Sequence, residues 1–370
     1  MFTQLAKDHV ANCRICFMCR HLCPVGLVTG KESHTPKGRA ILMEYSIGAE
    51  NAKEIFKSSV PAMYECCLCN ACADWCETGF EPGIFIREAR REAIVENVLP
   101  PNIAPVIDRL LKTGNLYDSP NSLEEEIASL PDKAEILLAI GNTALAKTPE
   151  IARALIGILK KAGVNFTALK NEPPMGGAMY DMVGELAEVQ NVARNFKEAA
   201  DATGCKIIVV LDPMDARLLV TDYPRWNCTP SAKVQTATSF VAGLLTNGKL
   251  QVKKQYKDLK VTYHDPCKLA RDLDETEPAR QIIAAIGADF NEIFLNKKDT
   301  RCCGNECLAS HAPQYTLMTA RARIEQAEAT GAKTLLVSCP GCLDVFATGR
   351  QEGNIQVKDL FVLLEECLKR

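Results

Sequence analysis

The chain has 370 residues and a mass of 40.5 kDa, which is enough for two or three domains. Hydrophobic residues make up 47% and charged residues 24%, so disordered and fibrous classes are excluded. The 43 basic and 46 acidic residues leave a net charge of −3, which gives no summed positive field to hold nucleic acid. No apolar stretch approaches the ~18 to 20 residues that span a bilayer, and residues 1–12 lack the pattern of an export signal. We therefore expect a cytoplasmic protein without a transmembrane segment.

The unusual feature of the composition is the number of cysteines, 18 in all. In a reducing compartment, cysteines at this density are more often metal ligands or redox groups than disulfides. Eight of them form two runs with the spacing C-x2-C-x2-C-x3-C: Cys13, Cys16, Cys19, Cys23 and Cys66, Cys69, Cys72, Cys76. This spacing is typical of cubane iron-sulfur sites, in which the fourth cysteine of each run binds the other cluster.

On that pattern each cluster combines three cysteines of one run with the last cysteine of the other. Cluster 1 takes Cys13, Cys16, Cys19 and Cys76, and cluster 2 takes Cys66, Cys69, Cys72 and Cys23. Four-thiolate zinc sites are the alternative, although zinc has no use for the third, evenly spaced cysteine. Cys67, between two ligands, is expected to be a packed thiol. The 42 residues between the runs carry apolar residues at helical spacing over 36–57, and a further helix is expected after Pro82.

Beyond a linker, short apolar runs alternate with helical patterns, which favours parallel sheets covered by helices. The expected strands are 135–140, 165–169, 206–211, 259–263, 289–294 and 333–337. The two halves repeat at an offset of 127 residues, with Gly177 matching Gly304 and Pro213 matching Pro340, which indicates duplication. At the end of the chain, 357–370 is expected to form an amphipathic helix carrying Cys367.

The second repeat carries Cys267, the pair Cys302 and Cys303, and the pair Cys339 and Cys342. With the two ferredoxin-type runs, this pattern resembles the iron-sulfur subunits of heterodisulfide reductase, glycolate oxidase and anaerobic glycerol-3-phosphate dehydrogenase. The resemblance implies that these five CCG cysteines hold one noncubane iron-sulfur cluster, in addition to two 4Fe-4S clusters in a helical ferredoxin module. One departure is Glu77, where a proline usually follows the last cysteine.

The expected fold is therefore α+β and multidomain. Residues 1–98 form the helical ferredoxin domain, 99–130 a linker, 131–248 a CCG lobe without ligands and 249–370 an intact CCG lobe, both lobes being Rossmann-like with parallel sheets. Subtracting 127 from the five CCG positions gives residues that cannot replace thiolates: Ile140, Met175, Gly176, Asp212 and Asp215. We expect this degenerate lobe to serve packing or docking; alternatively, its PPMGG loop shapes a pocket facing the intact lobe.

Three functions remain open. The resemblance favours an electron-transfer subunit between a flavin-containing dehydrogenase and a quinone or other acceptor, held at the inner membrane face through a partner. The alternative is a catalytic subunit that reduces a disulfide at the CCG cluster, with Cys307 as a possible catalytic thiol; Cys307 could equally be a buried hydrophobe. The third hypothesis is an assembly or scaffold protein whose CCG cysteines bind zinc.

The histidines are expected to be solvated or structural rather than part of a centre. His21, His264 and His311 nevertheless flank predicted ligands, so a hydrogen bond to sulfur is the alternative for each. Cys205, Cys228 and Cys367 are expected to be structural.

Overall fold

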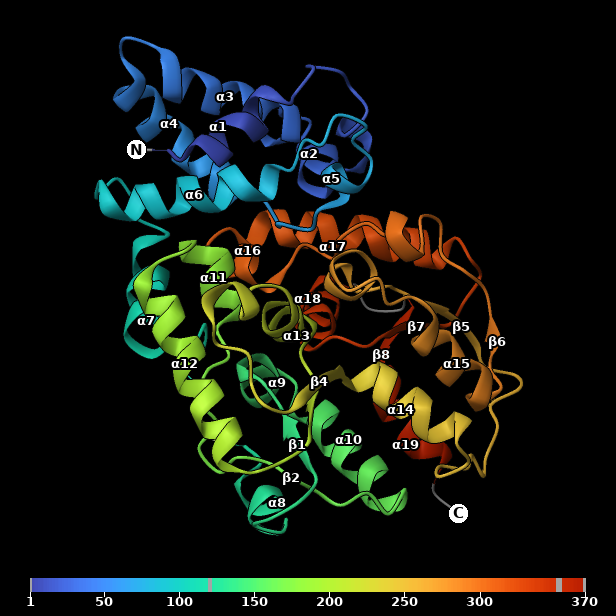
Figure 1. Cartoon of the computed structure of the whole chain (residues 1–370). Coiled ribbons are helices and arrows are strands. Elements are labelled where there is room, and N and C mark those ends of the chain that lie inside the picture. Colours follow the sequence, from blue (N-terminus) through green and yellow to red (C-terminus); the bar gives the residue numbers. More distant parts are fainter. Residues whose placement is uncertain (1, 119–121, 351–354, 369–370) are drawn as a thin grey trace.

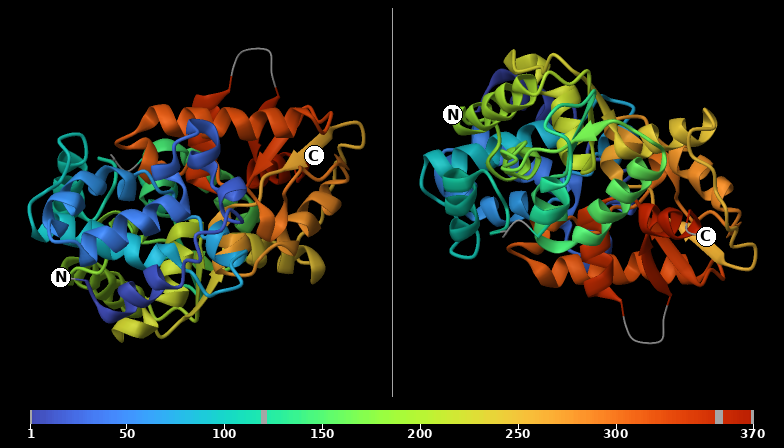
Figure 2. Two further views of the ribbon diagram at one scale, coloured as in Figure 1. Left: turned by 90° about the horizontal axis from the view of Figure 1, so that it is seen from above. Right: turned by 90° about the horizontal axis from the view of Figure 1, so that it is seen from below.

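The computed structural model describes residues 2–118, 122–350 and 355–368. It is an α+β fold with a helical N-terminal part above two four-stranded parallel sheets (Figure 1). Figure 2 shows, from below, that the two sheet-containing lobes lie side by side. Among the described residues no helix is both long and apolar enough to cross a membrane.

The N-terminal part consists of short helices that frame the two cysteine loops. Its helices are α1 (Gln4–Ala11), α2 (Pro24–Thr29), α3 (Pro36–Gly48), α4 (Ala52–Tyr64), α5 (Ala71–Asp74) and α6 (Pro82–Val95), with short 3-10 turns η1 (Arg20–Leu22) and η2 (Glu32–His34). Prolines open α2, α3 and α6, where a missing N–H costs nothing. The helical pattern predicted for 36–57 is confirmed, but it is divided between α3 and α4.

Two further helices occupy the stretch predicted as a linker: α7 (Ala104–Thr113) and α8 (Glu124–Ala128). α7 ends at Gly114, which adopts φ +70 and lies directly against Pro174 of the first lobe. A side chain at this position would be strained and would meet the Pro174 ring at 2.8 Å. The segment is therefore packed onto the lobe that follows it.

The first lobe has the strand order β2-β1-β3-β4, all parallel. Its strands are β1 (Ile136–Ala139), β2 (Phe166–Thr167), β3 (Ile207–Val210) and β4 (Lys233–Thr236). The helices are α9 (Asn142–Lys147), α10 (Pro149–Lys161), α11 (Gly177–Val183), α12 (Ala187–Ala202), α13 (Pro213–Thr221) and α14 (Ala237–Thr246), with η3 (Pro224–Trp226) before β4. The central strands β1 and β3 are apolar, since helices cover both of their faces.

The second lobe repeats this order as β6-β5-β7-β8. Its strands are β5 (Lys260–Tyr263), β6 (Asp289–Phe290), β7 (Thr334–Val337) and β8 (Gln356–Asp359). Its helices are α15 (Glu277–Ile286), α16 (Glu306–Ala309), α17 (Pro313–Glu328), α18 (Pro340–Gly349) and α19 (Leu360–Cys367), with the π-turn η4 (Lys268–Asp272) and η5 (Lys297–Asp299). The identical strand order supports the duplication inferred from the repeat.

The lobes pack with pseudo-two-fold symmetry. Helix α14 of the first lobe packs on α15 of the second, and α19 of the second packs reciprocally on α10 of the first. The N-terminal part contacts both lobes, through α6 on α11 and α2 on α17 (Figure 1). All three parts therefore meet near the carboxyl ends of the two sheets.

Two strands are absent from the sequence prediction, β4 and β8. Both are edge strands of mixed polarity, KVQT and QVKD, and each is only partly buried. The helix predicted over 357–370 is wrong at its start, because 357–359 belong to β8 and Asp359 caps α19. Residues 369–370 lie outside the described part.

Candidate metal centres

Both ferredoxin-type loops contain the same strained turn. The residue before the second cysteine of each run has a positive φ: Ile15 at 56 and Leu68 at 47. Such a backbone is unfavourable for residues with a Cβ and persists only where the surroundings require it. Here it lets the loop curl so that backbone N–H groups face sulfur, as Leu68 N faces Cys66 Sγ at 3.3 Å.

The cysteines predicted for cluster 2 line one small cavity. It is bordered by Cys23 from the first run and by Cys66, Cys69 and Cys72 from the second. Cys23 Sγ accepts a hydrogen bond of 3.4 Å from Gly26 N, at the start of α2. Burial raises the pKa of Cys23 and of Cys72, and neighbouring thiols of the same set raise both further. Four converging thiols that repel one another as anions are a donor set that a cationic iron-sulfur core would satisfy.

The cysteines predicted for cluster 1 lie nearer the surface, with Cys16 exposed. Burial raises the pKa of Cys13, and electrostatic repulsion from the neighbouring Cys16 and Cys76 raises it further. Thr78 Oγ1 bonds Asn12 O at 2.8 Å and contacts Cys76 Sγ at 3.2 Å, which ties the last cysteine of the second run to the first loop. The crossed ligand sets thus agree with the packing, and they stay a prediction until metal is measured.

The five CCG cysteines come together from three segments that follow β5, β6 and β7. Cys267, Cys302, Cys303, Cys339 and Cys342 line a cavity of about 30 Å³. Cys267 and Cys302 lie 3.9 Å apart at sulfur, and Cys303 and Cys342 lie 3.4 Å apart. Hydrogen bonds from Cys302 and Cys342 lower the pKa of Cys303. Five soft donors in a dry cavity fit an iron-sulfur group.

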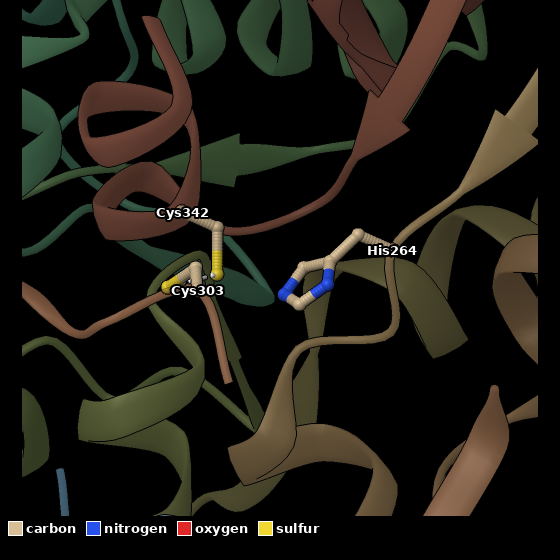
Figure 3. Close-up of side chains that lie close together, drawn as sticks. All are labelled: His264, Cys303 and Cys342. Atoms are coloured by element: carbon tan, nitrogen blue, oxygen red, sulfur yellow. Dashed lines mark hydrogen bonds between the residues drawn. The ribbon is translucent and has the colours of Figure 1, made fainter. Parts of the chain in front are cut away.

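A buried polar atom beside two of these cysteines has no hydrogen-bond partner in the described residues. It is Nε2 of His264, whose ring is fully buried and faces Cys303 and Cys342 (Figure 3). A solvated role for His264 is therefore wrong, whereas a structural role and a hydrogen bond to sulfur both stay predictions. His311, in contrast, contacts Tyr64 O at 3.2 Å through Nε2, which agrees with a structural role. His21 is exposed and packs edge-to-face on Trp75.

The second ferredoxin-type loop is joined to the CCG lobe by hydrogen bonds. Lys268 Nζ donates to Leu68 O at 2.9 Å and Arg271 Nε donates to Cys69 O at 2.6 Å. Asn305 Nδ2 donates to Cys67 O at 3.2 Å. The Cys67 and Cys69 side chains both neighbour Cys302, so predicted ligands of two different centres lie against each other.

A buried charge network holds this junction. Lys268 Nζ pairs with Asp181 at 3.1 Å and with Asp272 at 3.6 Å, and Arg87 of α6 pairs with Asp181 at 2.8 Å. Arg217 of α13 completes the network by pairing with Asp272 at 3.8 Å. Sequence reasoning missed Lys268 and Arg271, although both lie within four residues after the predicted ligand Cys267.

The degenerate lobe contains a cavity of about 270 Å³ where a second cluster would lie by symmetry. Strand register changes one of the five equivalent positions. Ile136 pairs with Ile207 and Val261 pairs with Thr334, and these two partners match at the offset of 127. Ile136 therefore corresponds to Val261, so the offset in this strand is 125. Cys267 then matches Asn142 and not Ile140. Asn142, Met175, Gly176, Asp212 and Asp215 all line the cavity, and none offers a thiolate.

This cavity adjoins the CCG cavity. Asp212, Met214 and Glu306 line both, and Glu306 Oε1 accepts a hydrogen bond of 3.1 Å from Thr143 across the lobe interface. Burial raises the pKa of Asp212 to about 6 and that of Glu306 well above its usual range. The cavity lies at the carboxyl end of the sheet, where open α/β folds bind ligands. Sequence reasoning gave a pocket at the PPMGG loop only as the alternative to packing or docking, and it missed Glu306.

Cys307 lies outside both cavities. Its Sγ contacts Ala178 O at 3.9 Å and the residue is buried in the core that α11 shares with α6. This placement is that of a packed thiol. Cys67, Cys205, Cys228 and Cys367 are also buried.

Comparison with known proteins agrees with both cysteine patterns. Residues 12–81 match the 4Fe-4S dicluster domain, and residues 261–347 match the cysteine-rich domain CCG. The chain thus carries a dicluster-type domain and a CCG-type domain. Its resemblance to the iron-sulfur subunits of heterodisulfide reductase is thereby confirmed.

Several relatives are named as oxidoreductases or their subunits. The chain is 27% identical to a subunit of the dihydromethanophenazine:CoB--CoM heterodisulfide reductase of Methanosarcina acetivorans. The match covers 96% of this chain and 93% of that subunit. It is 24% identical to a subunit of the fumarate reductase (CoM/CoB) of Methanothermobacter marburgensis, covering 96% and 71%. It is 25% identical to the EtfAB:quinone oxidoreductase of Syntrophomonas wolfei, covering 78% of this chain and 43% of that protein.

A solved structure shares the fold. It is a hypothetical protein from Helicobacter pylori, with a TM-score of 0.65 and 10% identity, covering 100% of this chain and 73% of that one. At this identity the likeness concerns the fold alone.

Proposed function

We propose that this protein relays electrons between a flavin-containing dehydrogenase and a quinone or other acceptor, through two 4Fe-4S clusters and one noncubane CCG cluster. The observation that carries the proposal is that Lys268 and Arg271, which follow Cys267 of the CCG set, donate hydrogen bonds to the second ferredoxin-type loop at Leu68 O and Cys69 O. Iron-sulfur clusters bound at these cysteines would accept and release single electrons. In this proposal electrons would pass between the first loop, where Cys16 is exposed, and the buried CCG cysteines.

The surface end of this row favours a protein partner. The first loop exposes three large apolar side chains, Ile15 at 53%, Phe17 at 61% and Met18 at 55%. Exposed apolar groups beside a redox centre suit a docking contact more than a solvated face. We place the flavin-containing dehydrogenase here, in keeping with the relative named an EtfAB:quinone oxidoreductase. A quinone-reducing membrane subunit is the proposed partner at the other end.

Anaerobic purification with assays of iron, sulfide and zinc tests the cofactors. About twelve irons per chain and no zinc are expected if each of the three sets holds four irons. Electron paramagnetic resonance of the reduced protein should show magnetic interaction between cluster 2 and the CCG centre. Cys302→Ser should remove this interaction while the ferredoxin-type clusters persist. About eight irons with one zinc would contradict a redox role for the CCG cysteines.

A second candidate is reduction of a disulfide at the CCG centre, favoured by the cavity that shares Asp212, Met214 and Glu306 with it. Reduction of a disulfide takes two electrons and two protons and yields two thiols. The relay would supply the electrons and the buried carboxyls would supply protons. A disulfide-dependent resonance signal would support this function. Cys307 has no place in it, because the thiol faces neither cavity.

A further inference from the structure

His264 is the polar side chain most deeply enclosed beside the CCG cysteines. It follows β5 directly, is 0% exposed, and packs edge-to-face on Phe346 at 4.9 Å. A ring nitrogen of His264 and the sulfurs of Cys303 and Cys342 all lie within 4.8 Å of one another. Figure 3 shows the ring edge turned toward the two sulfurs.

The two ring nitrogens have different surroundings. Arg323 Nε faces Nδ1 at 3.4 Å, whereas Nε2 has no hydrogen-bond partner among the described residues. Arg323 is itself fixed on α17, since its guanidinium donates to Phe294 O at 2.6 Å and to Leu295 O at 2.9 Å. An arginine N–H can only donate, so Nδ1 must accept.

The tautomer follows from this contact. In a neutral imidazole one nitrogen accepts and the other carries the proton, so an accepting Nδ1 places the proton on Nε2. The same contact requires a neutral ring, because a doubly protonated imidazole has no lone pair with which to accept from Arg323. A protonated Nε2 has no lone pair for iron or zinc, so the ring is a donor to sulfur and not a ligand.

We propose that His264 donates a hydrogen bond from Nε2 to a sulfur of the CCG centre, and that Arg323 is the positioning residue that fixes the donating tautomer. This inference rests on the proposed iron-sulfur group at the CCG cysteines. A hydrogen bond to sulfur stabilises the extra negative charge of the reduced state, so His264 raises the reduction potential of this centre. The ferredoxin-type clusters are not affected by it.

Two substitutions of similar polarity separate the donor from simple packing. His264→Gln can place an amide N–H near the position of Nε2, whereas the shorter side chain of His264→Asn cannot reach it. The control is His311→Gln, a change at another buried histidine of the same lobe that bonds Tyr64 O instead of facing sulfur. Arg323→Lys keeps a charge but removes the planar N–H that faces Nδ1.

The measurement is an anaerobic potentiometric titration followed by electron paramagnetic resonance, on protein of known iron content. We expect lower CCG potentials in His264→Asn and Arg323→Lys, and potentials near the wild type in His264→Gln and His311→Gln. Pulsed resonance in D₂O should detect an exchangeable deuteron near the reduced centre, absent from His264→Asn. An unchanged potential in iron-replete His264→Asn, or a strong nitrogen coupling typical of iron ligation, would overturn the inference. Loss of the CCG iron from the wild type would instead contradict the proposed function.

Discussion

Lys268 donates a hydrogen bond of 2.9 Å from its Nζ to the carbonyl oxygen of Leu68, 200 positions earlier in the chain. Lys268 follows the predicted CCG ligand Cys267, and Leu68 precedes the predicted cluster 2 ligand Cys69. One buried ammonium group thus joins the loops of two centres and also pairs with Asp181 and Asp272. The spacing of the centres therefore depends on a charge network that belongs to neither cysteine motif.

Lys268→Met tests this dependence. Removing one partner of a buried ion pair leaves uncompensated charge, so the free energy of unfolding should fall by about 3 to 5 kcal/mol. Anaerobic urea denaturation followed by tryptophan fluorescence measures the change. The matched control is Lys298→Met, whose pair with Asp274 is exposed and should contribute little to stability. Equal effects of the two substitutions would mean that the buried network does not stabilise the junction.

The crossed ligand sets are tested by substituting the last cysteine of the first run. Cys23→Ser should destroy cluster 2, whose other ligands lie more than 40 residues later, and should spare cluster 1. Iron analysis should show a loss of about four irons, and resonance should show that one ferredoxin-type signal persists. Cys67→Ser is the control, because this buried thiol lies beside the same cavity without a predicted ligand role. Loss of cluster 1 in Cys23→Ser would indicate local instead of crossed ligation.

The cavity of the degenerate lobe can be closed from its exposed rim. Asn171 lines it and is exposed, so Asn171→Trp should fill the entrance without disturbing the core. If a disulfide binds there, the variant should lose the disulfide-dependent signal while its iron content stays the same. Asn247→Trp, at another exposed asparagine that lines neither cavity, is the control. A disulfide-dependent signal that survives Asn171→Trp would place the substrate elsewhere.

Sequence patterns predicted most of the architecture because the deciding features are local. Cysteine spacing marks loops, and the apolar runs of β1, β3, β5 and β7 mark strands that are buried on both faces. The edge strands β4 and β8 were missed because KVQT and QVKD are partly exposed and carry no such run. A constant offset of 127 also failed at β1, where two residues fewer separate the copies and Asn142 replaces Ile140 as the match of Cys267.

The environment of the candidate centres could not be predicted from spacing. Which way His264 faces, and which atom it bonds, depends on Arg323 from α17, 59 positions later. Lys268, Arg271 and Glu306 acquire their roles only because three separate parts of the chain meet at one place. Cys307 shows the reverse, since proximity to Cys303 in sequence suggested a role that its side-chain direction does not support.

Asp359, which lies away from the predicted metal centres, should make the free energy of unfolding depend on pH. Its Oδ1 caps α19 by accepting from Phe361 N at 2.8 Å, while Oδ2 is buried without a hydrogen-bond partner in the described residues. Burial raises the pKa of Asp359 to about 7. A raised pKa means that its contribution to stability is fully present below the unfolded pKa of about 4 and is lost as pH rises through 7.

Asp359→Asn keeps the capping oxygen and cannot ionise, so its stability should not fall over this range. We expect the variant and the wild type to differ little at pH 4, and the variant to be more stable by a few kcal/mol, about 1.4 for each unit of pKa shift, at pH 8. Urea denaturation at both pH values measures this difference, and Asp258→Asn, at an exposed aspartate, is the control. A constant difference between Asp359→Asn and the wild type from pH 4 to 8 would show that Asp359 is ionised throughout.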